Sequence, residues 1–313
     1  MDARAFENAA NDALGPGRLA VDVPLAPFTT FRVGGAADWL AEVRSVDELR
    51  SLLGIARASR VPVTVLGGGS NVIVSDDGVR GLVVRLLLTG ISQPDEASVR
   101  AEAGVTINGL VRWTIGRGLA ALEAWAGTPG TVGGAIFGNA HWQGRNMGDL
   151  VTQVLLATPA GELSITPGSQ MAFAYDMSRL QKSGEILVWA DCRVLAGEPT
   201  ALRAEARRSL AYRKSTQPLA SPSAGCIFQN PEPGRDTIPA GIPASAGALV
   251  DRAGLKGRAV GGARISETHG NFIVNEGTAT AEDIRALVEL ARTTVRDRFG
   301  VVLRDEVVWL GAF

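Results

Sequence analysis

Two glycine-rich segments, sixty residues apart, constrain this chain more than any other feature. The first, Leu66–Asn71, reads Leu-Gly-Gly-Gly-Ser-Asn and ends the apolar run Val61–Leu66, which predicts a buried strand. Glycines without Cβ atoms let the backbone approach a ligand closely, and their successive N–H groups can form an anion-binding concavity. The second segment, Gly127–Ala135, repeats this character. Two such loops indicate a long ligand with a diphosphate, such as a dinucleotide.

Ordinary turns are the alternative interpretation, because glycine is the commonest turn former. Neither segment matches a common nucleotide fingerprint. The first lacks a third glycine at the dinucleotide spacing, and no Gly-Lys-Ser/Thr follows it as in a P-loop. A dinucleotide bound here therefore requires a different fold.

The composition excludes several classes of protein. The 31 Lys and Arg residues balance 32 Asp and Glu residues, which argues against a nucleic-acid partner. Two cysteines and two histidines are too few for a disulfide framework or a common metal site, so we expect no metal. The charged N-terminus does not resemble a signal peptide, and no apolar stretch reaches membrane-spanning length. We expect a soluble cytoplasmic protein with no membrane partner.

Periodic patterns predict several elements. A capping box at Ser45–Glu48 opens one helix, and a Thr280 N-cap with Asp283 at N3 opens the last, which Gly300 ends. Helices are also predicted over 106–117 and 200–213, and strands over 72–74, 82–86 and 301–309. The 215–243 stretch, with six prolines, predicts a long functional loop.

In their order and spacing, a series of motifs resembles the family of UDP-N-acetylenolpyruvoylglucosamine reductases. Besides the two glycine-rich segments, they cover both the N-terminal and the C-terminal parts of the chain. They are Thr29–Gly35, Pro222–Pro231, Gly247–Asp251 with Gly254–Gly257, Gly261–Ala263 with Ser266–His269, Asn271–Asn275 and Leu303–Val307.

The resemblance implies an α+β fold with an FAD-binding region of the vanillyl-alcohol-oxidase type, built from two α+β subdomains, and a C-terminal α+β substrate-binding domain. The expected divisions are 1–80 and 81–205 for FAD binding and 206–313 for the substrate. The short 185–226 stretch suggests the shorter of the family's two types. The resemblance further implies non-covalent FAD, held by Arg32, Gly67, Gly68, Gly69, Ser70, Asn71, Gly127, Thr128, Gly130, Thr131, Gly133 and Gly134.

The reaction implied is NADPH-dependent reduction of the enolpyruvyl ether of a UDP-sugar, giving UDP-N-acetylmuramate for peptidoglycan. Hydride addition builds negative charge on the substrate carboxylate, so the site must stabilise an anion and supply one proton. The family places a serine donor where this chain has Cys226, and a thiol, with a pKa of about 8.5, is a stronger acid than a hydroxyl. An inert buried thiol is the alternative. Cys192, in an apolar run, is expected in the core.

The C-terminal catalytic glutamate of the family corresponds to Glu306. The alternative interpretation is that Glu306 is an ordinary carboxylate on a surface strand. The family's arginine after a tyrosine corresponds to Asp176, which has the wrong charge. Arg179, three residues on, is a hypothetical replacement if the segment forms one helical turn. Asn230, Lys256 and His269 correspond to residues that contact the sugar nucleotide. The roles of His141 and Trp142, near the expected flavin, cannot be inferred from sequence.

The sequence is also compatible with two other functions. One is a non-catalytic flavoprotein on the same scaffold, which would bind FAD without reducing the enolpyruvyl substrate. The other is a flavin oxidase of the same fold. Oxidases of this class often tether the flavin through His or Cys, and the Gly67–Asn71 loop contains neither.

Overall fold

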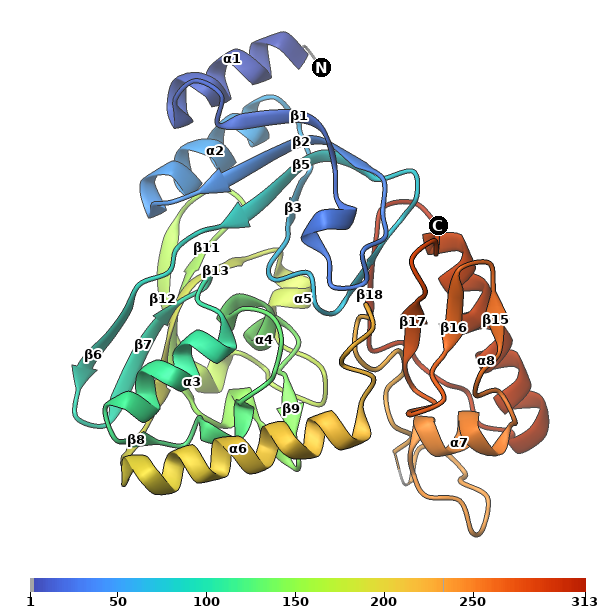
Figure 1. Ribbon diagram of the computed structural model, residues 1–313. Coiled ribbons are helices and arrows are strands. Elements are labelled where there is room, and N and C mark those ends of the chain that lie inside the picture. Colours follow the sequence, from blue (N-terminus) through green and yellow to red (C-terminus); the bar gives the residue numbers. More distant parts are fainter. Residues whose placement is uncertain (1–2, 233) are drawn as a thin grey trace. The chain divides into compact units, whose positions relative to one another are not determined.

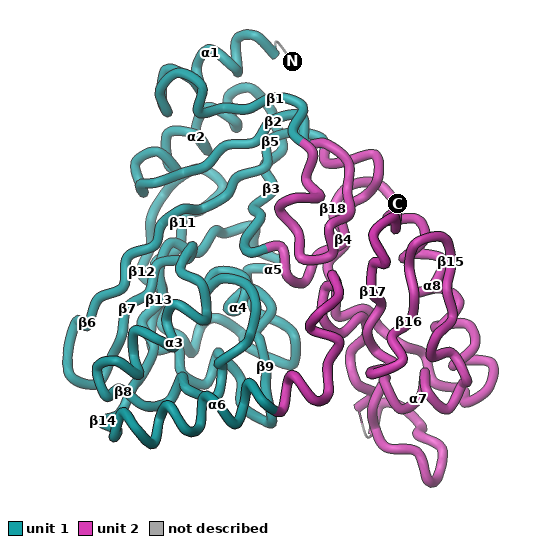
Figure 2. Tube along the Cα trace, in the orientation of Figure 1, with its two compact units in different colours: residues 1–23, 37–68, 80–211 teal, residues 24–36, 69–79, 212–313 magenta. Residues whose placement is uncertain are grey.

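The computed structural model describes residues 3–232 and 234–313, and Figure 1 shows their helices and strands. The chain forms two compact units, coloured separately in Figure 2. Unit 1 comprises residues 1–23, 37–68 and 80–211, and unit 2 comprises 24–36, 69–79 and 212–313. Two short N-terminal segments thus belong with the C-terminal residues. The division into 1–80, 81–205 and 206–313 stays a prediction.

Both units mix helices and strands, in agreement with the predicted α+β class. The helices are α1 (Ala3–Leu14), α2 (Val46–Ala58), α3 (Ile107–Gly116), α4 (Val132–Phe137), α5 (Leu180–Ser183), α6 (Pro199–Thr216), α7 (Ala246–Arg252) and α8 (Ala281–Phe299). The first strands are β1 (Leu19–Pro24), β2 (Ala36–Val43), β3 (Val63–Val65), β4 (Val72–Val74), β5 (Val79–Leu86), β6 (Ile91–Asp95), β7 (Ser98–Glu102), β8 (Leu119–Ala120) and β9 (His141–Trp142). The others are β10 (Arg145–Asn146), β11 (Val151–Ala157), β12 (Leu163–Pro167), β13 (Ile186–Arg193), β14 (Leu195–Ala196), β15 (Ala259–Val260), β16 (Ala263–Ile265), β17 (Ile273–Asn275) and β18 (Val308–Leu310).

In the first of two helix-and-sheet layers of unit 1, α1 and α2 pack on a four-stranded sheet of order β1-β2-β5-β3. The apolar stripe of α2 enters this core through Leu49, Leu52 and Leu53. Ser45 caps α2 by accepting from the Glu48 N–H, as predicted. The Glu48 carboxylate also accepts from the N–H of Arg44, at 2.7 Å.

The second layer pair of unit 1 is an antiparallel five-stranded sheet of order β12-β11-β13-β7-β6, with α3 and α4 packed on it. The predicted 106–117 helix is confirmed as α3, and Thr106 caps it. The core here includes Trp125 and Cys192, both fully buried. Cys192 is therefore a core residue, as predicted.

Unit 2 packs α7 and α8 against the three-stranded sheet β15-β16-β17, with β18 pairing in parallel with β4. The predicted ends of α8 are confirmed: Thr280 and Asp283 form a full capping box, and Gly300 ends the helix at a φ of 69°. Asp76 adds a second cap, because its carboxylate accepts from the N–H groups of Ala281 and Glu282. The 69–79 segment is thereby fixed to the C-terminal helix.

Two predicted strands differ from the structure. The buried strand expected over 61–66 is only β3, and its residue Val65 is exposed while the flanking Val61 and Leu66 are buried. The strand expected over 301–309 is only β18, because residues 301–307 are held through single bridges and loop contacts. In both places apolar residues contact the core from irregular backbone. Their run of apolar residues has the same pattern as a buried strand, so the sequence predicts a strand there.

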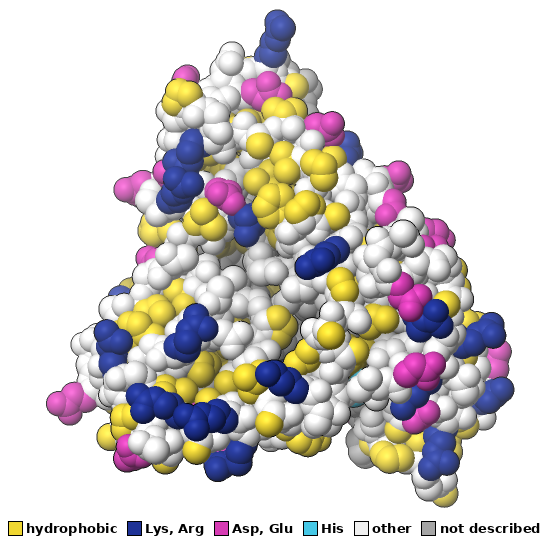
Figure 3. All heavy atoms as spheres, viewed as in Figure 1, with side chains coloured by type: hydrophobic (Ala, Val, Ile, Leu, Met, Phe, Trp, Pro, Cys, Tyr) yellow, Lys and Arg dark blue, Asp and Glu magenta, His cyan; other side chains and the backbone are white. Residues whose placement is uncertain are grey.

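The predicted 200–213 helix is confirmed as α6, and Figure 3 shows Lys and Arg side chains gathered along it. Arg203, Arg207 and Arg208 are exposed, whereas Arg213 is 6% exposed. Between α6 and α7 the described residues form neither helix nor strand, which agrees with the predicted loop. Among the helices of residues 3–232 and 234–313, none has the length and apolar character needed to cross a membrane.

Candidate functional site

The two glycine-rich segments meet in unit 1. A Cβ atom on Gly68 would lie 2.6 Å from the Cα of Gly130, which is closer than real side chains come to backbone. Only glycine at position 68 allows this approach. The sequence suggested that both loops serve one ligand, and the structure places their backbones in contact.

The second segment is held by α3 and α4. Asn108 of α3 accepts from the N–H of Gly127 and donates to the carbonyl of Thr128. Thr131 caps α4 by accepting from the N–H of Gly134, while the N–H of Gly133 bonds to Ala103. Asn108 was not singled out from the sequence, since an asparagine inside a helix carries no local signal for a distant turn.

The first segment presents unused donors. The backbone N–H groups of Gly67, Gly68, Gly69 and Ser70 donate to no acceptor among the described residues. Consecutive N–H groups of this kind form a binding site for anionic oxygens. The close-packed glycine backbones and these donors therefore fit the diphosphate of a dinucleotide.

The part of this segment that belongs to unit 2 packs on the Thr29–Gly35 motif. Gly69 has a φ of 62°, and a Cβ atom there would lie 2.0 Å from the carbonyl oxygen of Phe28. Its own carbonyl accepts from the N–H of Thr30, whose hydroxyl donates to Ser223. Arg32 is exposed, and its guanidinium pairs with none of the described residues, so it is available to a ligand.

Asn71 has a structural partner. Its side-chain amide donates to the backbone oxygen of Glu306 at 3.0 Å. The backbone oxygen of Asn71 accepts from Val308, which extends the pairing of β4 with β18. The end of the first glycine-rich segment thus fixes the backbone that carries Glu306.

Cys226 and Glu306 are held on adjoining backbone. The N–H of Glu306 donates to the carbonyl of Ile227, the residue after Cys226, at 2.8 Å. Cys226 forms a backbone bridge with Phe272 and is half-buried. The backbones that carry the thiol and the carboxylate, the two groups expected to handle protons, therefore adjoin within unit 2.

Asn271 fixes this arrangement. Its carbonyl accepts from the N–H of Ile227, and its side chain makes a pair of hydrogen bonds with the backbone of Phe228, at 2.9 and 2.7 Å. The side chain is buried. Sequence reasoning included Asn271 in a motif without a role, and only the tertiary structure shows what it positions.

Arg213 is a second residue that sequence reasoning missed. Burial lowers the pKa of its guanidinium to about 10, and the negative charge of the Cys226 thiolate partly opposes that shift. The two groups therefore lie within electrostatic range in unit 2. A buried cation beside a thiol favours the thiolate.

The predicted substrate residues also lie in unit 2. Asn230 accepts from the N–H of Ala246, the first residue of α7, and Lys256 pairs with Asp251 at 3.2 Å. His269 accepts from the N–H of Asn271 through Nδ1, which leaves its proton on Nε2. Burial and, secondarily, the charge of Lys256 lower the pKa of His269. The ring is therefore a neutral Nε2–H donor near pH 7.

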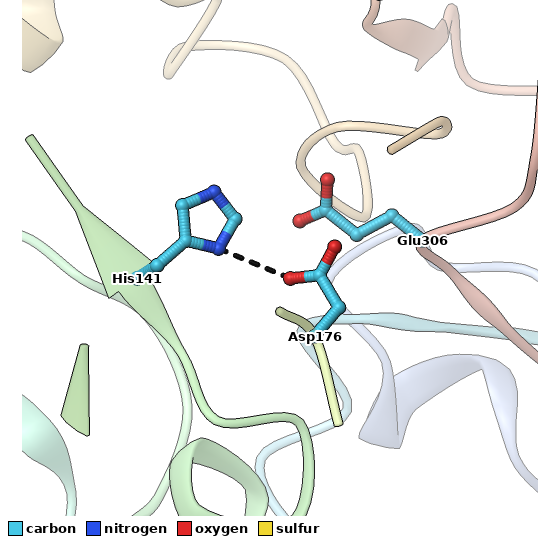
Figure 4. Close-up of side chains that lie close together, drawn as sticks. All are labelled: His141, Asp176 and Glu306. Carbon is cyan, nitrogen blue, oxygen red and sulfur yellow. Dashed lines mark ion pairs between the residues drawn. The ribbon is translucent and has the colours of Figure 1, made fainter. Parts of the chain in front are cut away.

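In unit 1, Arg179 is the N-cap residue of α5 and makes a bidentate pair with Glu185, at 2.9 and 2.7 Å. Asp176 occupies the position where the family has an arginine. Its carboxylate pairs with His141. Figure 4 shows Nδ1 of the His141 ring turned toward an oxygen of Asp176, 3.0 Å away. Trp142 donates to the hydroxyl of Ser209.

Two family models match the chain. Residues 37–166 match a model described as FAD binding domain. Residues 217–310 match one described as UDP-N-acetylenolpyruvoylglucosamine reductase, C-terminal domain.

Curated relatives match over nearly the whole length. A UDP-N-acetylenolpyruvoylglucosamine reductase of Synechococcus sp. (strain JA-3-3Ab) is 41% identical, covering 98% of this chain and 96% of its own. One from Anaeromyxobacter sp. (strain K) is 42% identical, over 93% of this chain and 85% of its own.

Solved structures agree. The crystal structure of the reductase from Thermus caldophilus superposes with a TM-score of 0.77 at 32% identity, covering 94% of this chain and 98% of that one. A glucose dehydrogenase, wild-type Phl p 4.0202, has a TM-score of 0.50 at 16% identity over 62% of this chain and 44% of its own, a likeness of fold alone.

Proposed function

Because this chain belongs to the UDP-N-acetylenolpyruvoylglucosamine reductase family, we propose that it reduces UDP-N-acetylenolpyruvoylglucosamine to UDP-N-acetylmuramate with NADPH as hydride donor. Membership makes it an FAD-dependent oxidoreductase of peptidoglycan precursor synthesis with an FAD-binding region of the vanillyl-alcohol-oxidase type. FAD, when bound, would supply the hydride-transfer chemistry that connects NADPH with the β-carbon of the enolpyruvyl ether. The two cysteines are free thiols, consistent with action in the cytoplasm.

The residues that would hold FAD are those of the two glycine-rich segments. The unused N–H groups of Gly67 to Ser70 would donate to the diphosphate oxygens, and Thr128, Gly130 and Thr131 belong to the facing loop. The cradle has no room for a Cβ at Gly68, so side chains are excluded from it. Arg32 adds a positive charge for a phosphate.

The observation that carries this proposal is the backbone hydrogen bond from Glu306 to Ile227, which brings the backbone of Glu306 beside the residue that follows Cys226. After hydride addition the α-carbon must receive a proton. The Cys226 Sγ–H supplies it, and the resulting thiolate is stabilised by the charge of Arg213 until it is reprotonated. Glu306, which corresponds to the catalytic glutamate of the family, would hold a shared proton near the substrate carboxylate.

The sugar nucleotide would contact the second half of unit 2. Lys256 offers a point charge to the diphosphate, and the neutral His269 offers its Nε2–H. Asn230 lies at the start of α7. Arg179 is retained as a candidate cation for the substrate carboxylate, although Glu185 already balances its charge.

The test is anaerobic. The holoenzyme is reduced with NADPH, the enolpyruvyl sugar nucleotide is added, and the oxidised flavin spectrum is followed. We expect the spectrum to return, and to return at least about a hundredfold more slowly in Cys226→Ala. Cys192→Ala is the matched control, since that thiol lies in the core.

A reduced enzyme that the sugar nucleotide does not reoxidise would contradict the proposal and favour the non-catalytic flavoprotein. Reoxidation only by oxygen, with an alcohol as reductant, would favour the oxidase. Acid-denatured protein that keeps its yellow colour would contradict non-covalent FAD.

A further inference from the structure

The His141–Asp176 pair is a charged pair of unit 1 that the proposed function leaves unused. Its residues come from β9 and from the loop before α5, thirty-five positions apart. The Asp176 side chain is 9% exposed, and the His141 side chain is 29% exposed. The carboxylate is therefore buried behind the ring, and the ring faces outward.

One oxygen of Asp176 lacks a partner. Oδ1 pairs with His141, but Oδ2 is buried and makes no hydrogen bond to any described residue. A buried carboxylate oxygen without a partner costs more stability than a buried neutral group without one. Asp176 also has a φ of 53°, in the region that L-residues seldom adopt. A buried, strained and half-satisfied carboxylate indicates a role other than stability.

The backbone around the pair is braced to α4, the helix that begins in the second glycine-rich segment. Asn139 donates to the carbonyl of Ala174, and Ser178 and Gln181 both donate to the carbonyl of Phe137. The ring of Tyr175 lies against that of His141, with centroids 5.0 Å apart. The ring of His141 is thus held by Tyr175 and Asp176, and the backbone that carries these two residues is bonded to the end of α4.

The outward nitrogen of the ring is Nε2. Nδ1 pairs with Asp176, whereas Nε2 bonds to none of the described residues. A ligand that hydrogen-bonds to this ring would therefore bind at Nε2. A ring that donates Nδ1–H to a carboxylate while presenting Nε2 has the geometry of an oriented acid–base or electrostatic group. In the imidazolium form it donates Nε2–H to an anion.

Resting on the proposed function, we propose that His141 is a catalytic residue whose Nε2–H binds the substrate carboxylate as its negative charge grows, and that Asp176 positions the ring. The reaction requires a cation or donor for that carboxylate. Asp176 occupies the position where an arginine is expected. Its carboxylate pairs with the imidazole of His141 in β9. No bond forms or breaks at His141 in this role.

Two substitutions of His141 separate its nitrogens. His141→Asn keeps an amide nitrogen near the Nδ1 position and removes the outward donor, whereas His141→Gln keeps a donor near the Nε2 position. We expect His141→Asn to slow flavin reoxidation by the enolpyruvyl sugar nucleotide by about a hundredfold or more and to weaken substrate binding. His141→Gln should lose less than about tenfold, and NADPH should reduce both at wild-type rate.

Asp176→Asn tests the positioning role. Asparagine tolerates the positive φ, so the backbone is retained. We expect about tenfold slower reoxidation together with loss of the fixed proton on Nδ1, measured by ¹⁵N spectra of the histidine-labelled holoenzyme. The chain has two histidines, so the His141 signals are assigned by their absence in His141→Asn. Glu48→Gln, which breaks the ion pair with Arg18, is the control and should leave both half-reactions unchanged.

Wild-type reoxidation rates in His141→Asn would overturn the inference while leaving the proposed function intact. An unchanged Nδ1 proton in Asp176→Asn would overturn the positioning role of Asp176. If the wild-type enzyme itself is not reoxidised by the sugar nucleotide, the proposed function fails and this role of His141 fails with it.

Discussion

The side-chain amide of Asn71 donates to the backbone oxygen of Glu306, a hydrogen bond that joins residues 235 positions apart. A residue expected at the cofactor is thus also the residue that fixes the backbone of the expected catalytic carboxylate. Because β4 follows Asn71 and β18 follows Glu306, the bond closes the end of the parallel β4–β18 pair.

Asn71→Ala should impair the second half-reaction more than FAD binding. Loss of the amide leaves the Glu306 backbone less constrained and costs about 1 kcal/mol of stability. We expect about tenfold slower reoxidation by the sugar nucleotide. The affinity for FAD should decrease less in Asn71→Ala than in Ser70→Ala, the comparison variant at the neighbouring position. A variant that loses FAD but reoxidises normally would place Asn71 at the cofactor only.

Gly68→Ala should reduce FAD binding without unfolding the protein. The added Cβ would meet Gly130 at 2.6 Å and force the two loops apart. We expect at least about tenfold weaker FAD binding by fluorescence titration of the apoprotein. Gly54→Ala is the matched control: it lies in α2 with open space around it, and should raise stability by about 0.5–1 kcal/mol with FAD affinity unchanged. Equal FAD affinity in both variants would argue against the cradle.

The two cysteines should differ in reactivity. Burial raises the pKa of Cys192 to about 12, so iodoacetamide should leave it unmodified in the native protein. Cys226 is half-buried beside Arg213 and should be alkylated. Arg213→Met should slow that alkylation by about tenfold at pH 7.5, because the thiolate loses the positive charge of Arg213. Mass spectrometry of tryptic peptides measures both sites, and modification of Cys192 alone would contradict the assignment.

Acidification should destabilise unit 2 through His269. Its pKa is lowered in the folded state, so the unfolded chain binds more protons as the pH falls through the ordinary histidine range near about 6.5. Stability is therefore fully present above that range and decreases below it. Urea unfolding at pH 7.5 and 5.5 should show a larger loss for wild type than for His269→Gln. Equal losses would show that another group causes the pH dependence.

Arg179→Ala should chiefly affect stability. It leaves the carboxylate of Glu185, 10% exposed, without its bidentate partner, at a cost of about 2 kcal/mol and a several-degree decrease in Tm. We expect kcat to stay within a few-fold of wild type. A loss of kcat larger than that of His141→Asn would instead make Arg179 the cation of the site.

The elements predicted correctly are those decided by neighbours in the chain. Thr280 and Asp283 cap α8 through hydrogen bonds between residues three apart, and Gly300 ends it by its own φ. Thr106 does the same for α3. The strands predicted over 61–66 and 301–309 are longer than those observed. Apolar residues that contact a core from a loop have the same composition as a strand.

The sequence alone therefore determined the mixed helix and strand content, the two glycine-rich segments, the candidate thiol at Cys226 and the family, because these depend on residue type, order and local spacing. Only the tertiary structure decided that residues 24–36 and 69–79 belong to the C-terminal unit, and that Asp176 binds His141 while Arg179 binds Glu185. A charged side chain pairs with whatever opposite charge the folded backbone brings within about 4 Å, and proximity along the chain does not fix that choice.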